Sequence, residues 1–84
     1  MNKHRKMLLK VLQGNADANI PFEGLCDLLK HLGFDERISG SHHVFRRAGV
    51  EDRINLQCDG DKAKVYQVRQ VRAMISRNNL GSEL

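Results

Sequence analysis

The feature that most constrains the fold is a change in the spacing of apolar residues on either side of Gly33. Between positions 22 and 32, apolar residues recur every three or four residues, which is the spacing of one face of a helix. Beyond it, Ile54, Leu56 and Cys58 alternate with polar residues, which is the spacing of a half-buried strand. Because 84 residues are too few for a second core, both patterns must be buried in one α+β domain.

Glycines and other turn formers divide the chain into six expected elements. We expect helices over 4–13, 22–32 and 66–80, and strands over 34–38, 42–47 and 53–58. Three antiparallel strands with helices on one face would form a two-layer sandwich and leave the other sheet face open to a partner. We treat residues 1–84 as one domain, with a core over 20–80 and an extra helix and loop over 1–19.

Basic residues are concentrated at the two ends of the chain. Residues 1–10 carry four Lys/Arg and no acid, and residues 61–84 carry five Lys/Arg against two acids. Residues 11–60 carry five Lys/Arg against eight acids, and the whole chain has a net charge of +4. This distribution fits a partner that carries phosphates, and it fits a solvated basic surface equally well.

No segment has the length expected of a membrane span, since the longest unbroken apolar run is three residues. The basic start followed by apolar residues 7–9 resembles a signal peptide, but Lys10 and Gln13 interrupt its apolar region. We therefore expect a cytoplasmic protein with no membrane partner. Cys26 and Cys58 form no Cys-x-x-Cys pair; they could form one disulfide, although a cytoplasmic chain favours buried thiols packed in the core.

The segment 40–47, Gly-Ser-His-His-Val-Phe-Arg-Arg, carries the residues best suited to chemistry. Successive strand residues point to opposite faces, so His42 and His43 cannot readily bind one metal ion together. If Phe45 points into the core, His43 shares its face and has a structural role, whereas His42 faces the open side. A histidine there can move a proton near neutral pH, although most strand histidines are packing or surface residues.

Cations that could accompany such a histidine lie in two places. Arg46 and Arg47 follow the histidine pair, and Lys62 and Lys64 precede the last expected helix, whose N-terminus favours anions. Together with His42 they form a set suited to RNA cleavage, in which a base deprotonates the 2′-OH and cations stabilise the attacked phosphate. We expect no metal and no cofactor, because the remaining histidines have no ligand spacing to this pair.

The segment 38–45, Ile-Ser-Gly-Ser-His-His-Val-Phe, resembles the Gly-Ser-His-His segment of HicA-type toxins. The similarity continues over Leu-Gly-Phe at 32–34, Ile-Asn-Leu-Gln at 54–57 and the tail 63–72, and so covers about residues 20–80 in the right order. The sequence departs from the family in its basic helix over 4–13, to which we assign no role. It also has Val65 where some members carry proline.

The resemblance implies a fold similar to double-stranded-RNA-binding domains. It also implies a type II toxin–antitoxin pair whose toxin is an mRNA interferase, a metal-independent endoribonuclease with one catalytic histidine, here His42. Its implied partners are mRNA and a HicB-type antitoxin that silences it. Gly40 would then set the turn that presents His42. Two other interpretations stay open, namely a non-catalytic RNA-binding module and an interaction domain with no RNA affinity.

Overall fold

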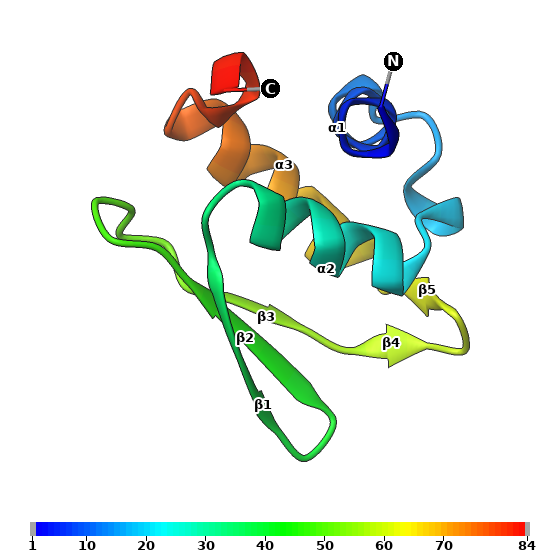
Figure 1. Cartoon of the computed structure of the whole chain (residues 1–84). Coiled ribbons are helices and arrows are strands. Elements are labelled where there is room, and N and C mark those ends of the chain that lie inside the picture. The colour runs from blue at the N-terminus through cyan, green and yellow to red at the C-terminus, as the bar shows by residue number, and fades with distance from the viewer. Residues whose placement is uncertain (1, 84) are drawn as a thin grey trace.

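The computed structural model describes residues 2–83 and shows an α+β chain with three helices and a three-stranded antiparallel sheet (Figure 1). The helices are α1 (Lys3–Gln13), α2 (Phe22–His31) and α3 (Val65–Arg77). The strands are β1 (Asp35–Ser39), β2 (His42–Arg46), β3 (Ile54–Leu56), β4 (Cys58–Asp59) and β5 (Lys62–Ala63). Short 3₁₀ turns cover Asp17–Asn19 and Leu80–Glu83. None of the helices within residues 2–83 has both the length and the apolar character that crossing a bilayer requires.

The central strand β2 pairs with β1 on one side and β3 on the other, in the order β1-β2-β3. Ser39 lies opposite His42 across the β1–β2 ladder, and Phe45 lies opposite Ile54 across the β2–β3 ladder. Helices α2 and α3 lie on the same side of this sheet (Figure 1). The expected α+β class with a three-stranded antiparallel sheet is therefore confirmed, and the sheet has one face toward α2 and α3 and one face away from them.

Helix α2 ends at His31, one residue before the expected end, and the chain reverses at Gly33 as expected. Gly33 has a φ of +92°, in the left-handed region that glycine adopts without steric cost. The Phe34 N–H donates to the Leu29 carbonyl at 3.0 Å, and the Gly33 N–H donates to the Lys30 carbonyl at 3.0 Å, as in a Schellman cap. This reversal buries Phe34 and directs the chain from α2 into β1.

The N-terminal segment is part of the same core rather than an appendage to it. Leu8 and Val11 of α1 belong to the single buried cluster that also contains the apolar faces of α2 and α3. The ring of His4 stacks on that of His31 of α2, with centroids 4.0 Å apart. Arg72 of α3 donates to the Val11 carbonyl at 3.0 Å and so fixes the end of α1.

The strand expected over 53–58 is shorter in the structure, because β3 ends at Leu56. The Gln57 N–H donates to the side-chain Oε1 of Gln67 in α3 at 2.8 Å, so this donor is used by a helix residue instead of a sheet partner. The chain then forms the β4–β5 hairpin, in which Cys58 lies opposite Ala63. The expectation that Cys58 is buried is therefore wrong: its side chain is exposed, whereas Cys26 is buried as expected.

The β4–β5 hairpin also forms part of the segment that precedes helix α3. Lys62 and Ala63 form β5, and a bridge between Lys62 and Pro21 joins this strand to the start of α2. Helix α3 begins at Val65 and ends at Arg77, so the helix expected over 66–80 is three residues shorter at its C-terminal end. Leu80 is nevertheless buried, because the terminal 3₁₀ turn returns it to the core.

Candidate functional site

His42 is the first residue of β2 and is exposed on the sheet face that is directed away from the helices. The loop before it has two residues, Gly40 and Ser41, and only Gly40 has a positive φ, of +60°, as in a type II′ hairpin turn. Phe45, three residues further along the same strand, is fully buried. The strand alternation that predicted an accessible His42 is therefore confirmed.

One hydrogen bond fixes the orientation and the tautomer of this histidine. Its Nδ1 lies 3.1 Å from Oδ1 of Asn55 on β3. An amide oxygen only accepts, so Nδ1 carries the proton and donates it, and Nε2 of the neutral ring keeps its lone pair. Within residues 2–83 no protein group bonds to Nε2, so this nitrogen can act as a base toward a molecule on the open face.

The open face also carries arginines from β1, from β2 and from the residue before β3. Arg37, Arg46 and Arg53 line one hollow of about 600 Å³, together with Asp35, Glu36, Ser39 and Val44. All three arginines are exposed, and none has a hydrogen bond or ion pair with any residue of 2–83. Of the two expected phosphate-binding arginines, Arg46 is therefore placed on the face of His42.

Sequence reasoning missed Arg37 and Arg53 as members of this group. Arg37 lies opposite Val44 in the β1–β2 ladder, and residues that face each other in a ladder share a sheet face. The sequence alone could have placed Arg53 on the open face, because Arg53 is next to Ile54 and neighbouring residues in an extended chain point to opposite faces. Placing Arg37 on this face also requires the register of the β1–β2 hairpin, which the turn at Gly40 sets.

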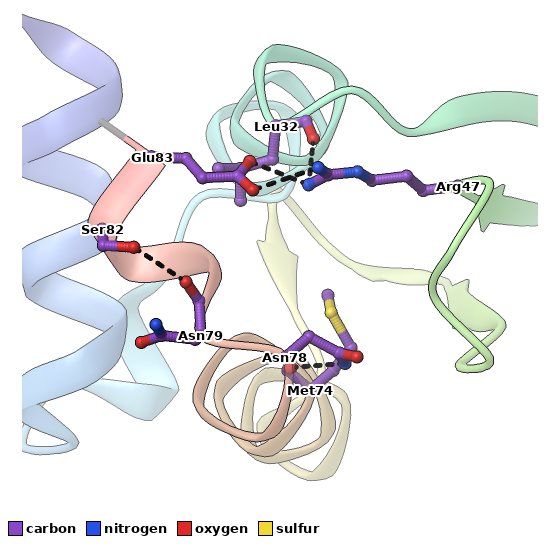
Figure 2. Close-up of polar contacts among 7 residues, drawn as sticks. All are labelled: Leu32, Arg47, Met74, Asn78, Asn79, Ser82 and Glu83. Atoms are coloured by element: carbon purple, nitrogen blue, oxygen red, sulfur yellow. Dashed lines mark hydrogen bonds and ion pairs between the residues drawn. The ribbon is translucent and has the colours of Figure 1, made fainter.

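Arg47 is engaged elsewhere, although it was expected to hold phosphate (Figure 2). Its guanidinium donates to both carboxylate oxygens of Glu83, at 2.9 and 3.0 Å, and to the Leu32 carbonyl at 2.9 Å. The Glu83 carboxylate raises the pKa of Arg47. These contacts join the end of β2, the end of α2 and the terminal 3₁₀ turn, so Arg47 has a structural role.

The two lysines expected at the last helix are in different surroundings. Lys64 precedes α3 and donates to Gln57 Oε1 at 3.2 Å, and Gln57 Nε2 donates to Ser41 Oγ at 3.1 Å. These two bonds connect Lys64 to the turn that presents His42. Lys62 lies on β5, where its ammonium is 3.8 Å from Asp61, and within residues 2–83 no contact connects it with His42.

His43 has the structural surroundings expected for it. It is half-buried on the helix side, where its ring packs edge-on against Phe22 with centroids 4.9 Å apart. Its Nδ1 lies 2.7 Å from Glu36 Oε2, and this hydrogen bond is the main reason that the pKa of Glu36 is lowered. His43 is therefore held away from the open face.

Glu36 and His43 are also the residues that could hold a metal, together with Cys26 of α2. One ligand atom from each of the three lies within 4.8 Å of the others, and no second group of this kind occurs within residues 2–83. Burial raises the pKa of the Cys26 thiol to about 12, so this cysteine is not a nucleophile at neutral pH.

The open face thus carries a base nitrogen and unpaired guanidinium groups on one surface, a combination of groups suited to proton transfer at a bound phosphate. The hydrogen bond from His42 to Asn55 and the exposure of Arg46 are the geometric core of this site. Comparison with protein-family models, with curated proteins and with solved structures finds no match for the chain.

Proposed function

We propose that this protein is an endoribonuclease of the HicA type, the toxin of a toxin–antitoxin pair that cleaves mRNA without a metal ion. The observation that carries the proposal is His42 itself. Its Nδ1 bonds to Asn55, its Nε2 has no bonding partner within residues 2–83, and it shares an exposed face with unpaired arginines.

In the proposed reaction, Nε2 of His42 removes the proton of a ribose 2′-OH. The freed oxygen attacks the adjacent phosphorus, the bond to the 5′-oxygen breaks, and a 2′,3′-cyclic phosphate and a 5′-OH end result. Arg46, assisted by Arg37 and Arg53, stabilises the extra negative charge on the phosphate, since guanidinium groups bind phosphate oxygens in pairs.

The departing 5′-oxygen needs a proton from a second donor. His43 lies on the opposite face of the sheet, so it does not serve this purpose. Water and Lys64 remain, and Lys64 is connected to Ser41 through Gln57. Restriction to RNA follows from the reaction, because DNA lacks the 2′-OH that must be deprotonated.

The order of elements supports the proposal from a second direction. Apart from the short β4–β5 hairpin inserted before α3, the core elements follow the order α2-β1-β2-β3-α3, which is the order of the double-stranded-RNA-binding-domain-like fold that the resemblance implies. The Gly-Ser-His-His segment forms the β1–β2 turn and the start of β2. An exposed sheet edge at β1 is also available to the HicB-type antitoxin that we propose as its partner.

The test is incubation of the purified chain with a long RNA, with and without a chelator, followed by analysis of the RNA ends. We expect cleavage to cyclic-phosphate ends that the chelator does not change. Because general acid–base catalysis contributes about 10²- to 10⁴-fold, His42→Ala should lower the rate by at least about 100-fold. His31→Gln, a histidine substitution on α2, is the matched control and should cleave like the wild type.

Cleavage by His42→Ala at the wild-type rate would overturn the assignment of His42. Salt-sensitive RNA binding with no cleavage products in any variant would establish the alternative, a non-catalytic RNA-binding module on the same arginine face. In cells, induction of the wild type should arrest growth and His42→Ala should not. Co-expression of a small antitoxin encoded next to the toxin should relieve the arrest.

A further inference from the structure

A second hollow, of about 830 Å³, lies on the helix side of the sheet. Residues of α2, β1, β2 and the β4–β5 region line it, among them Cys26, Glu36 and His43. It therefore lies on the opposite side of β2 from His42. Nothing in the proposed RNA cleavage uses these residues.

The donors in this hollow differ from those of the open face. A thiol, a carboxylate and an imidazole each place one ligand atom within 4.8 Å of the other two. Sulfur and imidazole nitrogen with one carboxylate oxygen form a ligand set that zinc prefers, whereas magnesium and calcium prefer oxygen alone.

The charge of the hollow also favours a cation. Besides His43, its lining includes the carboxylates Glu23, Asp27, Glu36 and Asp61 and one lysine, Lys30, whose ammonium is 3.5 Å from Glu36. This acidic lining occurs in a chain whose net charge is +4. A divalent ion would thus enter a region of negative potential.

We propose that Cys26, Glu36 and His43 form a binding site for one Zn²⁺ ion, which joins α2 to the β1–β2 hairpin. The proposal does not rest on RNA cleavage. Zinc bonds of about 2.0–2.3 Å in a tetrahedron separate ligand atoms by roughly 3.3–3.8 Å. A set already within 4.8 Å reaches this geometry through side-chain rotations, and water completes the coordination.

Two side chains of the proposed site also hydrogen-bond to one another. The hydrogen bond between His43 Nδ1 and Glu36 Oε2 satisfies both side chains, and within residues 2–83 no buried side-chain N or O atom lacks a partner. Zinc would take the place of the thiol proton of Cys26, because a coordinating thiol is deprotonated by the charge of the ion.

The experiment titrates the purified, metal-free full-length chain with Co²⁺ and then with Zn²⁺. Tetrahedral Co²⁺ bound to a thiolate shows d–d bands and a sulfur-to-cobalt charge-transfer band, and Zn²⁺ should remove both at one equivalent per chain. Since the loss of an outer-shell partner alone weakens metal binding by about 10- to 100-fold, Cys26→Ser and His43→Gln should each weaken it by more than about 100-fold.

The matched controls are substitutions of a histidine and a cysteine that lie near the proposed ligands but do not belong to them. His42→Gln changes the neighbour of His43, which lies on the other sheet face. Cys58→Ser changes the exposed cysteine that lines the same hollow as Cys26. Both variants should keep the charge-transfer band. Circular dichroism of each metal-free variant shows whether it is folded. A rise in melting temperature with Zn²⁺ in the wild type, absent in Cys26→Ser, would support the site independently.

Three results would each overturn the proposal. They are the absence of saturable 1:1 binding, a charge-transfer band that survives in folded Cys26→Ser, and a band that disappears in Cys58→Ser but persists in Cys26→Ser. The His42 variant separates this proposal from the proposed nuclease activity, because it should bind metal normally and cleave no RNA.

Discussion

The two sides of the sheet treat their arginines differently. On the helical side, each of three arginines bonds a carboxylate, in the pairs Arg47–Glu83, Arg72–Asp17 and Arg77–Asp52. On the open face, Arg37, Arg46 and Arg53 have no ion pair within residues 2–83. The N–H donors and the charge of a paired guanidinium are already used by a carboxylate, which stabilises the fold. Those of an unpaired guanidinium are available to bind a phosphate.

The adjacent histidines show the same contrast within one dipeptide. His43 bonds a carboxylate and packs against Phe22, while His42 bonds only a neutral amide and stays exposed. The alternation of strand side chains puts one residue into the structural layer and its neighbour onto the surface available for binding. The predictions below test this division.

The largest expected effect comes from the residue that separates the two sides. Phe45 is fully buried, so Phe45→Ala should lower the free energy of unfolding by about 3–5 kcal/mol, through lost burial and the cavity left behind. Val44, next to Phe45, is half-buried on the open face, so Val44→Ala should lower the free energy of unfolding by about 1 kcal/mol or less. Urea denaturation measures both. Equal losses would mean that the sheet does not have one core face and one open face.

The second largest expected effect is the difference in unfolding free energy between substitutions of a paired and an unpaired arginine. Arg72→Met removes two hydrogen bonds to Asp17 and one to the Val11 carbonyl, and should cost about 1.5–3 kcal/mol of unfolding free energy. Arg46→Met keeps the same aliphatic stem on the open face and should change stability by no more than about 0.5 kcal/mol. A comparable loss in the Arg46 variant would show that the open-face arginines also stabilise the fold.

The Arg72 contribution should also depend on pH. The side-chain hydrogen bond from Arg72 lowers the pKa of Asp17 below its ordinary value of 3.8, so the unfolded chain takes up this proton first as the pH falls. The stabilisation is complete above about pH 5 and is lost as the pH falls through the folded-state pKa. The difference in unfolding free energy between wild type and Arg72→Met should therefore be smaller at pH 2.5 than at pH 7. Denaturation at pH 7 and pH 2.5 checks this; a constant difference would contradict it.

The smallest expected effect concerns RNA binding under the proposed function. Each lost phosphate contact lowers the slope of log K against log salt by about 0.7 for single strands. Arg46→Met should therefore reduce the slope by about this amount, in a His42→Ala background that prevents cleavage. Arg77→Met, which removes the exposed arginine paired with Asp52, should leave the slope unchanged. Fluorescence anisotropy at several salt concentrations measures both slopes, and equal slopes would remove the distinction between the two sides.

Local signals were sufficient for much of the fold. The spacing of apolar residues predicted α2 and its end at Gly33, and strand alternation predicted that Phe45 is buried and His42 exposed. The prediction for Cys58 failed although its alternation was regular, because Gln67 of α3 takes the Gln57 N–H and ends β3 early. No local pattern reports that a residue ten positions away competes for a backbone donor.

The candidate site was predictable to a similar extent. The sequence identified His42 and Arg46, but it also counted Arg47 among the RNA-binding residues. Only the structure shows that Arg47 bonds Glu83, 36 residues away, and that Asn55 fixes the proton of His42. The group of Cys26, Glu36 and His43 had no spacing signal, because its members come from three different elements.

By itself, the sequence determined most of the residues that face the core and the position of most turns, because side-chain direction repeats within one helix or strand and glycine adopts left-handed turn geometry without cost. The tertiary structure decided which charges are neutralised and which remain free. Arg72 reaches Asp17 across 55 residues, and such a contact depends on the path of the whole chain. Ion pairs between elements form only after packing has fixed the distance between their backbones.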